Sequence, residues 1–295
     1  VTSHGGSIYI EIANHEPSNL IEISRCSFEN GATDKLIQHG GFIYYKFNPQ
    51  SSATSTLSTS HNLHIYDCTF TGTDSKISSE NGGSISILIP EKEPSKSIEI
   101  KNCTFTQCQC SVSAGAICYT NKATSSPSTD YSFNIIDCKF TGCKASYGGA
   151  IYVSNTAESQ IKILKCKFEQ NSAALSSSSS DENDPYFGGS AIFMAALNGI
   201  ILRCKFANNI GIGVKIFNKN EQLQKMILKS EQLSIKIDDC VFETDEKSKS
   251  SLFYVRGSKN EIPVEVNGCV FQGKMPDGSY HIDGESMIDS KKPMN

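Results

Sequence analysis

A pattern of alternating apolar and polar residues recurs along the chain and predicts short β-strands. Its core is two apolar residues separated by one polar residue, as in Ile98-Glu99-Ile100. A side-chain period of two is typical of a strand with one buried face. The pairs are Ile21/Ile23, Leu63/Ile65, Ile98/Ile100, Phe133/Ile135, Ile161/Ile163, Ile235/Ile237 and Val264/Val266, and the sixth unit has Gly199 before Ile201.

A second strand is predicted at the triplet Cys-x-Phe, which follows each apolar pair. Eight of the 12 cysteines belong to such triplets, and successive triplets lie 28 to 42 residues apart. Ile100 and Cys103 are three positions apart, so strict alternation would place them on opposite faces. A bend at the two residues between them returns both to one face. The triplets are Cys26/Phe28, Cys68/Phe70, Cys103/Phe105, Cys138/Phe140, Cys166/Phe168, Cys204/Phe206, Cys240/Phe242 and Cys269/Phe271.

A Gly-Gly pair followed by alternating apolar residues predicts a third strand in each unit. Residues 148–153, Gly-Gly-Ala-Ile-Tyr-Val, give the clearest copy. Glycines suit a sharp corner that requires positive φ or a close approach of two backbones. Matching segments begin at Gly5, Gly40, Gly82, Ala114, Gly148 and Gly188, with weaker forms at Gly211 and Leu252.

Three strands in each unit of about 35 residues, repeated about eight times, predict an all-β fold, a parallel β-helix. Residues 1–295 then form one domain, with coils about 4.8 Å apart and a length of roughly 40 Å. Equivalent residues of successive units stack, so Phe rings and Cys side chains fill the interior. Parallel crossover connections favour a right-handed, single-stranded solenoid of the pectin-lyase-like class.

Three insertions are expected between the repeated strands. They are residues 46–61, 172–186 and 218–232. Eight of the ten residues from Ser51 to Ser60 are Ser or Thr, and Ser176 to Ser180 are all Ser, compositions typical of solvated loops. The segment from Asn220 to Leu233 has a roughly helical apolar period, so we expect either a short helix or a loop there.

Charge and hydropathy limit the possible partners. The 27 Lys and Arg against 31 Asp and Glu give a net charge of -4, so sequence-independent nucleic-acid binding has no electrostatic basis. No apolar run approaches the roughly 18 residues of a membrane helix, so membrane attachment is expected only through a segment outside this chain. The start at Val1 without a leader favours a fragment of a larger protein.

The repeats resemble those of the polymorphic outer membrane proteins (Pmp), described in chlamydial surface autotransporters and in surface proteins of some parasitic protists. The family motif Gly-Gly-Ala-(Ile/Leu/Val) matches residues 148–151, and Phe-x-x-Asn matches residues 168–171 and 206–209. Elsewhere the Asn is shifted or replaced, for example by Cys108 or Cys143. The resemblance covers nearly the whole chain at the level of the repeat. It implies a right-handed β-helix outside the cell, at a surface where it contacts a host protein or glycan, and the Cys-x-Phe regularity fits the protist branch better.

The sequence allows three roles for the cysteines: disulfide bonds, metal ligands or packed thiols. Neighbouring triplet cysteines lie within disulfide distance, but side chains stacked in parallel suit the S–S torsion poorly, so a reduced internal ladder is favoured. No Cys-x-x-Cys pair or histidine cluster supports a metal site, and no cofactor is expected. Outside the triplets, a Cys108–Cys143 or a Cys110–Cys118 disulfide stays open beside free thiols.

Outward positions of the coils offer two candidate binding columns. Lys139, Lys167 and Lys205 form a like-charge column, which either protects a sheet edge, the favoured interpretation, or attracts an anionic glycan. Tyr9, Tyr44 and Tyr152 either form an outward aromatic column or reflect ordinary strand propensity.

The bend positions carry two further features. Three pairs of opposite charge are expected between neighbouring coils, namely Arg25–Asp67, Asp137–Lys165 and Arg203–Asp239. The one sequon, Asn102-Cys103-Thr104, lies at a bend rather than in a loop, where glycosylation is not favoured.

We expect a non-enzymatic interaction module at the cell surface, which adheres to host cells, glycans or matrix. The alternative is a polysaccharide lyase or glycoside hydrolase, since many parallel β-helices act on acidic polysaccharides. Such enzymes need clustered or paired carboxylates, whereas the acids in the repeat columns are single, and no catalytic, cofactor or metal residue is assigned. A structural spacer is a third possibility, because repeat folds share architecture without sharing a ligand.

Overall fold

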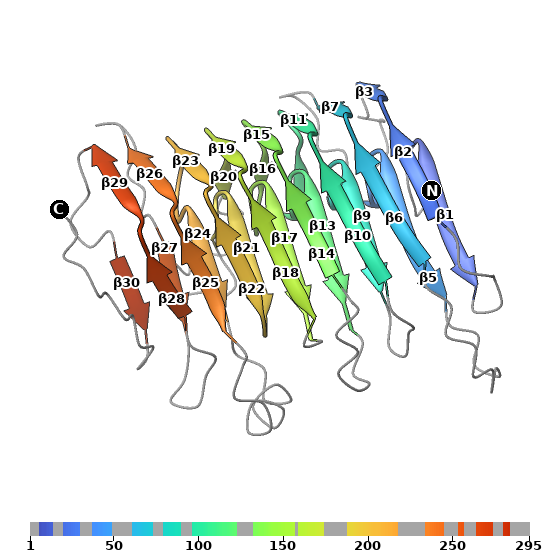
Figure 1. Ribbon diagram of the computed structural model, residues 1–295. Helices are drawn as coiled ribbons and strands as arrows, with labels where there is room; N and C mark the ends of the chain where they lie inside the picture. Colours follow the sequence, from blue (N-terminus) through green and yellow to red (C-terminus); the bar gives the residue numbers. More distant parts are fainter. Residues whose placement is uncertain are drawn as a thin grey trace.

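Three long parallel sheets form the walls of an elongated stack of coils (Figure 1). The computed structural model describes residues 6–13, 20–29, 37–48, 61–72, 79–89, 96–122, 132–156, 159–173, 188–217, 234–244, 253–256, 264–273 and 280–283. Within these ranges, no helix has the length and apolar character needed to cross a membrane.

Each of the eight coils contributes one strand to each wall, and β1, which precedes the first coil, adds a ninth strand to the third wall. The first wall, from the apolar pairs, contains β2 (Leu20–Ser24), β6 (His61–Tyr66), β10 (Lys96–Lys101), β14 (Ser132–Ile136), β18 (Gln160–Leu164), β22 (Gly199–Leu202), β25 (Ile235–Asp238) and β28 (Val264–Asn267). The second wall, from the triplets, contains β3 (Ser27–Glu29), β7 (Thr69–Thr71), β11 (Thr104–Thr106), β15 (Lys139–Thr141), β19 (Lys167–Glu169), β23 (Lys205–Ala207), β26 (Val241–Thr244) and β29 (Val270–Gly273).

The third wall contains nine strands, from the Gly-Gly segments. They are β1 (Ile8–Ala13), β5 (Ile43–Asn48), β9 (Ile85–Ile89), β13 (Ile117–Asn121), β17 (Ile151–Asn155), β21 (Ile192–Ala196), β24 (Val214–Phe217), β27 (Phe253–Arg256) and β30 (Tyr280–Asp283). The predicted parallel β-helix is therefore confirmed, and the eight strands of the first wall and of the second match the expected eight coils.

A residue in the left-handed backbone region forms the bend between the first and second walls. The φ angle immediately before the triplet Cys is 52° at Asn102, 55° at Lys165 and 54° at Arg203. Residues with a Cβ rarely adopt this region, and Lys and Arg tolerate it less well than Asn and Asp. Hydrogen bonds between coils help to hold the bend, since the Asn102 N–H donates to the Ile136 carbonyl at 3.0 Å and the Lys165 N–H to the Leu202 carbonyl at 2.8 Å.

A continuous pillar of eight phenylalanine rings fills the interior. Neighbouring ring centroids lie 4.7–5.2 Å apart and the ring planes differ by at most 13°. The spacing follows the strand spacing because each triplet Phe pairs in register with the Phe of the next coil. The predicted stacking of successive triplets is confirmed.

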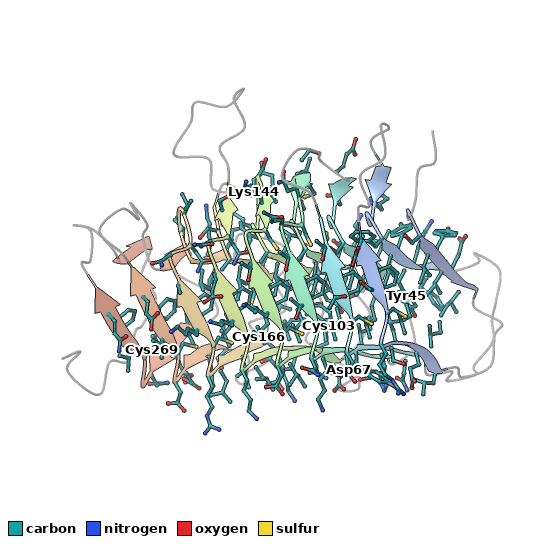
Figure 2. The ribbon with its side chains drawn as sticks, turned by 90° about the horizontal axis from the view of Figure 1, so that it is seen from above. Tyr45, Asp67, Cys103, Lys144, Cys166 and Cys269 are labelled. Atoms are coloured by element: carbon teal, nitrogen blue, oxygen red, sulfur yellow. The ribbon has the colours of Figure 1, made fainter. Side chains whose placement is uncertain are left out.

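The triplet cysteines form a column beside this pillar, and Figure 2 labels Cys103, Cys166 and Cys269 along it. Cys103 Sγ lies 3.2 Å from the Lys101 carbonyl oxygen and 3.6 Å from that of Ile65, one coil earlier, so its single hydrogen has two acceptors within reach. Seven of the eight triplet thiols have this pair of acceptors. A small buried donor satisfied by two carbonyls explains why Cys suits the position.

The Gly-Gly corner combines a left-handed first residue, which is Ala114 with φ of 64° in one copy, with a second residue that another coil approaches closely. Gly82 and Gly148 have φ angles of 64° and 61°. A Cβ on Gly115 would lie 2.3 Å from the Gly149 carbonyl oxygen, and one on Gly83 would lie 2.0 Å from the Gly115 oxygen. The first position therefore needs left-handed backbone and the second needs close contact between coils, as the sequence predicted.

The connection between the second and third walls contains short paired strands of its own. It contains the three-stranded sheet β4 (Ile37–His39), β8 (Ser79–Asn81) and β12 (Cys110–Ser113), and the pair β16 (Lys144–Ala145) and β20 (Ser172–Ala173).

Backbone pairing also corrects the ends of two predicted insertions. Residues 46–48 belong to β5, His61 begins β6, and residues 172–173 form β20, because pairing between coils extends beyond the apolar alternation. The rest of the three predicted insertions lies outside the described residues, namely residues 49–60, 174–186 and 218–232. The segment from Asn220 to Leu233, for which a helix or a loop was expected, also lies outside them.

Candidate interaction surface

The bend between the first and second walls turns three residues out of four toward the outside. Leu164 ends β18, Lys165 is the left-handed bend residue and Lys167 begins β19, whereas Cys166 between them is buried. Strict alternation would allow only two outward residues in four. The bend therefore carries a denser row of outward side chains than the flat parts of the walls.

An apolar stripe runs along this bend over three coils. Ile136, Leu164 and Leu202 lie in register on β14, β18 and β22 and are half-buried. In the same column Lys101 precedes the stripe and Asp238 follows it. The stripe is thus confined to the middle of the described rod.

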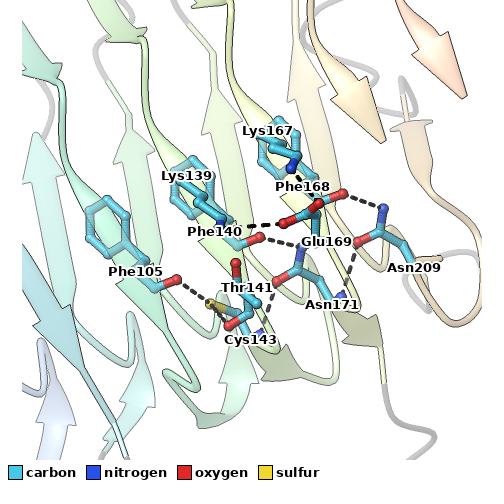
Figure 3. Close-up of polar contacts among 10 residues, drawn as sticks. All are labelled: Phe105, Lys139, Phe140, Thr141, Cys143, Lys167, Phe168, Glu169, Asn171 and Asn209. Atoms are coloured by element: carbon cyan, nitrogen blue, oxygen red, sulfur yellow. Dashed lines mark hydrogen bonds and ion pairs between the residues drawn. The ribbon is translucent and has the colours of Figure 1, made fainter. Parts of the chain in front are cut away.

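Lys139, Lys167 and Lys205 lie in register as a column on the second wall, and Figure 3 shows the first two of them. Lys167 Nζ lies 2.6 Å from Glu169 Oε1, Lys139 Nζ lies 3.5 Å from Glu169 Oε2, and Lys205 Nζ lies 2.8 Å from Glu243 Oε1. The hydrogen bond from Lys167 holds the pKa of Glu169 below its usual range. Because the three lysine side chains remain 41–50% exposed, each pair is worth under about 1 kcal/mol and the ammonium groups stay accessible.

Among the residues of the fifth and sixth coils that the structure describes, 159–173 and 188–217, cations exceed carboxylates. We call this surface the lysine face and define it as Lys162, Lys165, Lys167, Arg203 and Lys205 with the stripe Ile136, Leu164 and Leu202. Lys162 and Lys165 form no ion pair with any described residue, while Arg203 Nε lies 3.6 Å from Asp239 Oδ2. A cationic face on a chain of net charge -4 separates charge along the rod.

Two interpretations of the sequence are corrected here. The lysine column does not protect a sheet edge, because β15, β19 and β23 each have a hydrogen-bonded neighbour on both sides. Of the three opposite-charge pairs expected at the bend, Arg203–Asp239 forms an ion pair, whereas Arg25–Asp67 and Asp137–Lys165, also described, form none. These bend side chains are exposed, and an exposed pair gains little from fixing two long side chains.

Buried amides beneath the lysine face tie its coils together (Figure 3). Asn171 Oδ1 accepts the Cys143 N–H at 2.9 Å, and Asn171 Nδ2 donates to the Phe140 carbonyl at 3.1 Å. Asn209 Oδ1 accepts the Asn171 N–H at 3.0 Å. These are the asparagines of the Phe-x-x-Asn motif, and their bonds between coils keep the face rigid.

Of the two interpretations left open for Tyr9, Tyr44 and Tyr152, the structure does not support a continuous outward aromatic column. Tyr9 and Tyr44 stack at 5.6 Å, but Tyr9 is 44% exposed and Tyr44 only 1%. Register then places Ser86 and Cys118 in the column before Tyr152. The His39 ring packs on Tyr44 at 4.9 Å, because the Gly-Gly corner folds the preceding residue toward the strand that follows.

The four cysteines outside the triplets are buried free thiols in the structure, as are most triplet cysteines. Burial raises the pKa of Cys118 to about 12 and also raises that of Cys110, so both are neutral at physiological pH. Among the residues that the structure describes, no group of three or more His, Cys, Asp or Glu side chains could hold a metal ion.

The sequence-based prediction included the lysine column but missed Lys162 and the apolar stripe. Each stripe residue directly follows an inward Ile, for example Leu164 after Ile163. The alternation within the strand was therefore a sufficient signal that these apolar side chains face outward.

Comparisons with known proteins agree with this architecture. A family model described as a right handed beta helix region matches residues 91–290, about two thirds of the chain. Searches of curated proteins and of solved structures found no match. With its three parallel walls and its stacked register, the chain belongs to the right-handed β-helix family.

Proposed function

We propose that the protein is a non-enzymatic interaction module outside the cell, which binds anionic glycans through the lysine face. The observation that carries the proposal is the excess of cations on adjacent coils of a rigid wall. Five cations, Lys162, Lys165, Lys167, Arg203 and Lys205, lie on these two coils, and among the described residues of the same coils the one carboxylate is Glu169. The apolar stripe between them adds a contact for the carbon face of a sugar ring.

The spacing suits a linear anionic polymer. Cations on successive coils lie about 4.8 Å apart along the axis, and the bend sets a second row beside them. Each exposed contact is worth under about 1 kcal/mol, so affinity comes from several contacts made at once. Salt screens such contacts, with a Debye length of about 10 Å at 0.1 M.

The likeness to Pmp repeats supports a place at a cell surface, with a host surface protein or glycan as the partner. The Phe-x-x-Asn residues Asn171 and Asn209, which carry part of that likeness, lie directly beneath the lysine face. A protist-type surface protein is the form of this proposal that the Cys-x-Phe regularity favours.

Binding to immobilised heparin, a highly sulfated linear polysaccharide, tests the proposal. We expect Lys162→Ser with Lys165→Ser to weaken binding roughly tenfold, because two exposed contacts are lost. The matched control Lys46→Ser with Lys122→Ser removes the same charge from β5 and from the end of the coil at β13. An equal loss in both double variants would mean non-specific charge attraction and would overturn the proposed face.

The same preparation separates the other two functions. New reducing ends or unsaturated products from pectate, alginate or glycosaminoglycans, with or without calcium, would replace the proposal with a polysaccharide lyase or hydrolase. Binding no stronger than that of an unrelated β-helix would favour a structural spacer.

A further inference from the structure

The sequon at residues 102–104 lies at the expected bend, but the exposure of Asn102 there reverses the interpretation that the bend disfavours glycosylation. Asn102 is the left-handed residue, with φ of 52°, between β10 and β11. This conformation breaks the strand alternation, so Asn102 and Thr104 both face outward while Cys103 is 1% exposed. The two residues that define an Asn-x-Thr acceptor are therefore on the same accessible side.

The surroundings of Asn102 leave room for a bulky group. Its neighbours in the bend column, Asp67 and Asp137, are exposed like Asn102 itself. Asn102 Nδ2 donates one hydrogen bond, to Asp67 Oδ1 at 2.5 Å. An amide nitrogen carries two hydrogens, so one can be replaced while the other keeps this bond.

The backbone at the bend does not depend on the Asn102 side chain. The Asn102 N–H donates to the Ile136 carbonyl at 3.0 Å, and the φ angle is the same as at Asp137 and Arg25. A side-chain modification at this position thus leaves the contacts between coils in place.

We propose that Asn102 is an N-glycosylation site when the chain is made in a eukaryotic secretory pathway. The donor is an oligosaccharide linked to a lipid diphosphate. The bond between sugar C1 and the phosphate oxygen breaks, a bond from C1 to Asn102 Nδ2 forms, Nδ2 loses one proton, and the lipid diphosphate leaves. Only the choice of compartment rests on the proposed surface function.

The position gives the glycan a defined relation to the lysine face. Asn102 lies on the third coil, one coil before Ile136 and two before Lys165. The glycan would project from the same bend column without replacing a residue of the face. It would be the single N-linked chain, because the sequence contains one sequon.

The test is expression with a secretion leader in eukaryotic cells, followed by treatment with a peptide N-glycosidase. We expect one downward mobility shift, with Asn102 recovered as Asp by peptide mass spectrometry. Asn102→Gln and Thr104→Val should abolish the shift, and Thr104→Ser should retain it. Asn134→Gln, at a half-buried position of the next coil without a sequon, should leave it unchanged.

Wild-type protein with no shift in either the secreted or the endoplasmic-reticulum fraction would overturn the proposal. A shift that persists in both Asn102→Gln and Thr104→Val would do the same. The Thr104 pair keeps the test decisive if Asn102→Gln folds poorly. The readout is independent of heparin, so a failed lysine face and a failed glycosylation site give different results.

Discussion

At the scale of single residues, the position three residues after the triplet Phe holds Asn or Cys in four coils, and both side chains contact a neighbouring coil. Asn171 and Asn209 bridge coils through amides, whereas Cys143 and Cys108 occupy the equivalent position with thiols 3.8 and 3.5 Å from the carbonyls of Phe105 and Phe70. An amide both donates and accepts, while a thiol is a weak donor. The column therefore tolerates Cys, but the asparagine coils are tied more strongly.

Replacing Asn171 tests this difference. Asn171→Ala leaves the buried Cys143 N–H and Phe140 carbonyl without their partner, so we expect the free energy of unfolding to fall by about 3 kcal/mol. Asn171→Cys should cost less than Asn171→Ala. Exposed Asn267→Ala, which loses one surface bond, should cost under about 1 kcal/mol. Urea unfolding measures all three, and equal costs for Ala and Cys would contradict the account.

A second residue-scale prediction concerns Tyr44. Burial first, and then the charge of Glu11, raise the pKa of Tyr44 from 10.0 to about 12. A raised pKa contributes stability that is complete below pH 10 and is lost as the pH rises toward 12. When the pH is raised from about 8 to 11.5, the free energy of unfolding should fall in both proteins. The fall should be about 2 kcal/mol smaller in Tyr44→Phe than in the wild type. Parallel losses in urea titrations at the two pH values would show that Tyr44 is not the titrating group.

At the scale of elements, the strand pair around each bend is the unit that repeats. The walls were predictable because apolar alternation and the Cys-x-Phe triplet report directly which residues face inward. The lysine face was only partly predictable, since its apolar stripe uses residue types that a core also uses. The burial of Tyr44 depends on neighbours from other coils and on the Gly-Gly corner, and the spacing within one strand contains no such information.

The thiol column gives the element-scale prediction. Ten cysteines are buried, and Cys26 and Cys269, at the two ends of the column, are partly exposed. In native protein prepared without reductant, we expect an alkylating reagent to label Cys26 and Cys269 first and the other ten only upon unfolding. Mass spectrometry counts the labels. Fewer than eight reactive thiols in denatured, unreduced protein would contradict the reduced ladder.

At the scale of the whole molecule, stability is shared between neighbouring coils rather than held by one central core. Every wall strand pairs only with the coils before and after it, and the phenylalanine pillar continues through all eight coils. Such a stack behaves as a sum of units and interfaces. Removing one complete unit should therefore shorten the rod without disrupting the fold.

Deleting residues 68–102 removes one complete unit and joins Asp67 to Cys103, as in the natural repeat. We expect a folded protein whose urea m-value falls by roughly one eighth, because less surface is exposed on unfolding. Heparin binding should be unchanged, since the lysine face is retained. A second deletion, whose end is displaced by one residue, changes the strand register by one position. It should fail to fold, because the triplet Cys and Phe would then face outward. Equal stability of both deletions would contradict the register argument.

The corners of this rod have a practical consequence for engineering. Connections of very different length leave the pairing of the walls unchanged, since triplets 28 and 42 residues apart are equally in register. A peptide epitope grafted between Lys122 and Ser132, and again at the equivalent point of another coil, would be presented at a pitch fixed by backbone geometry. The distance between two displayed antigens would then be set by the number of coils that separate the two insertion points.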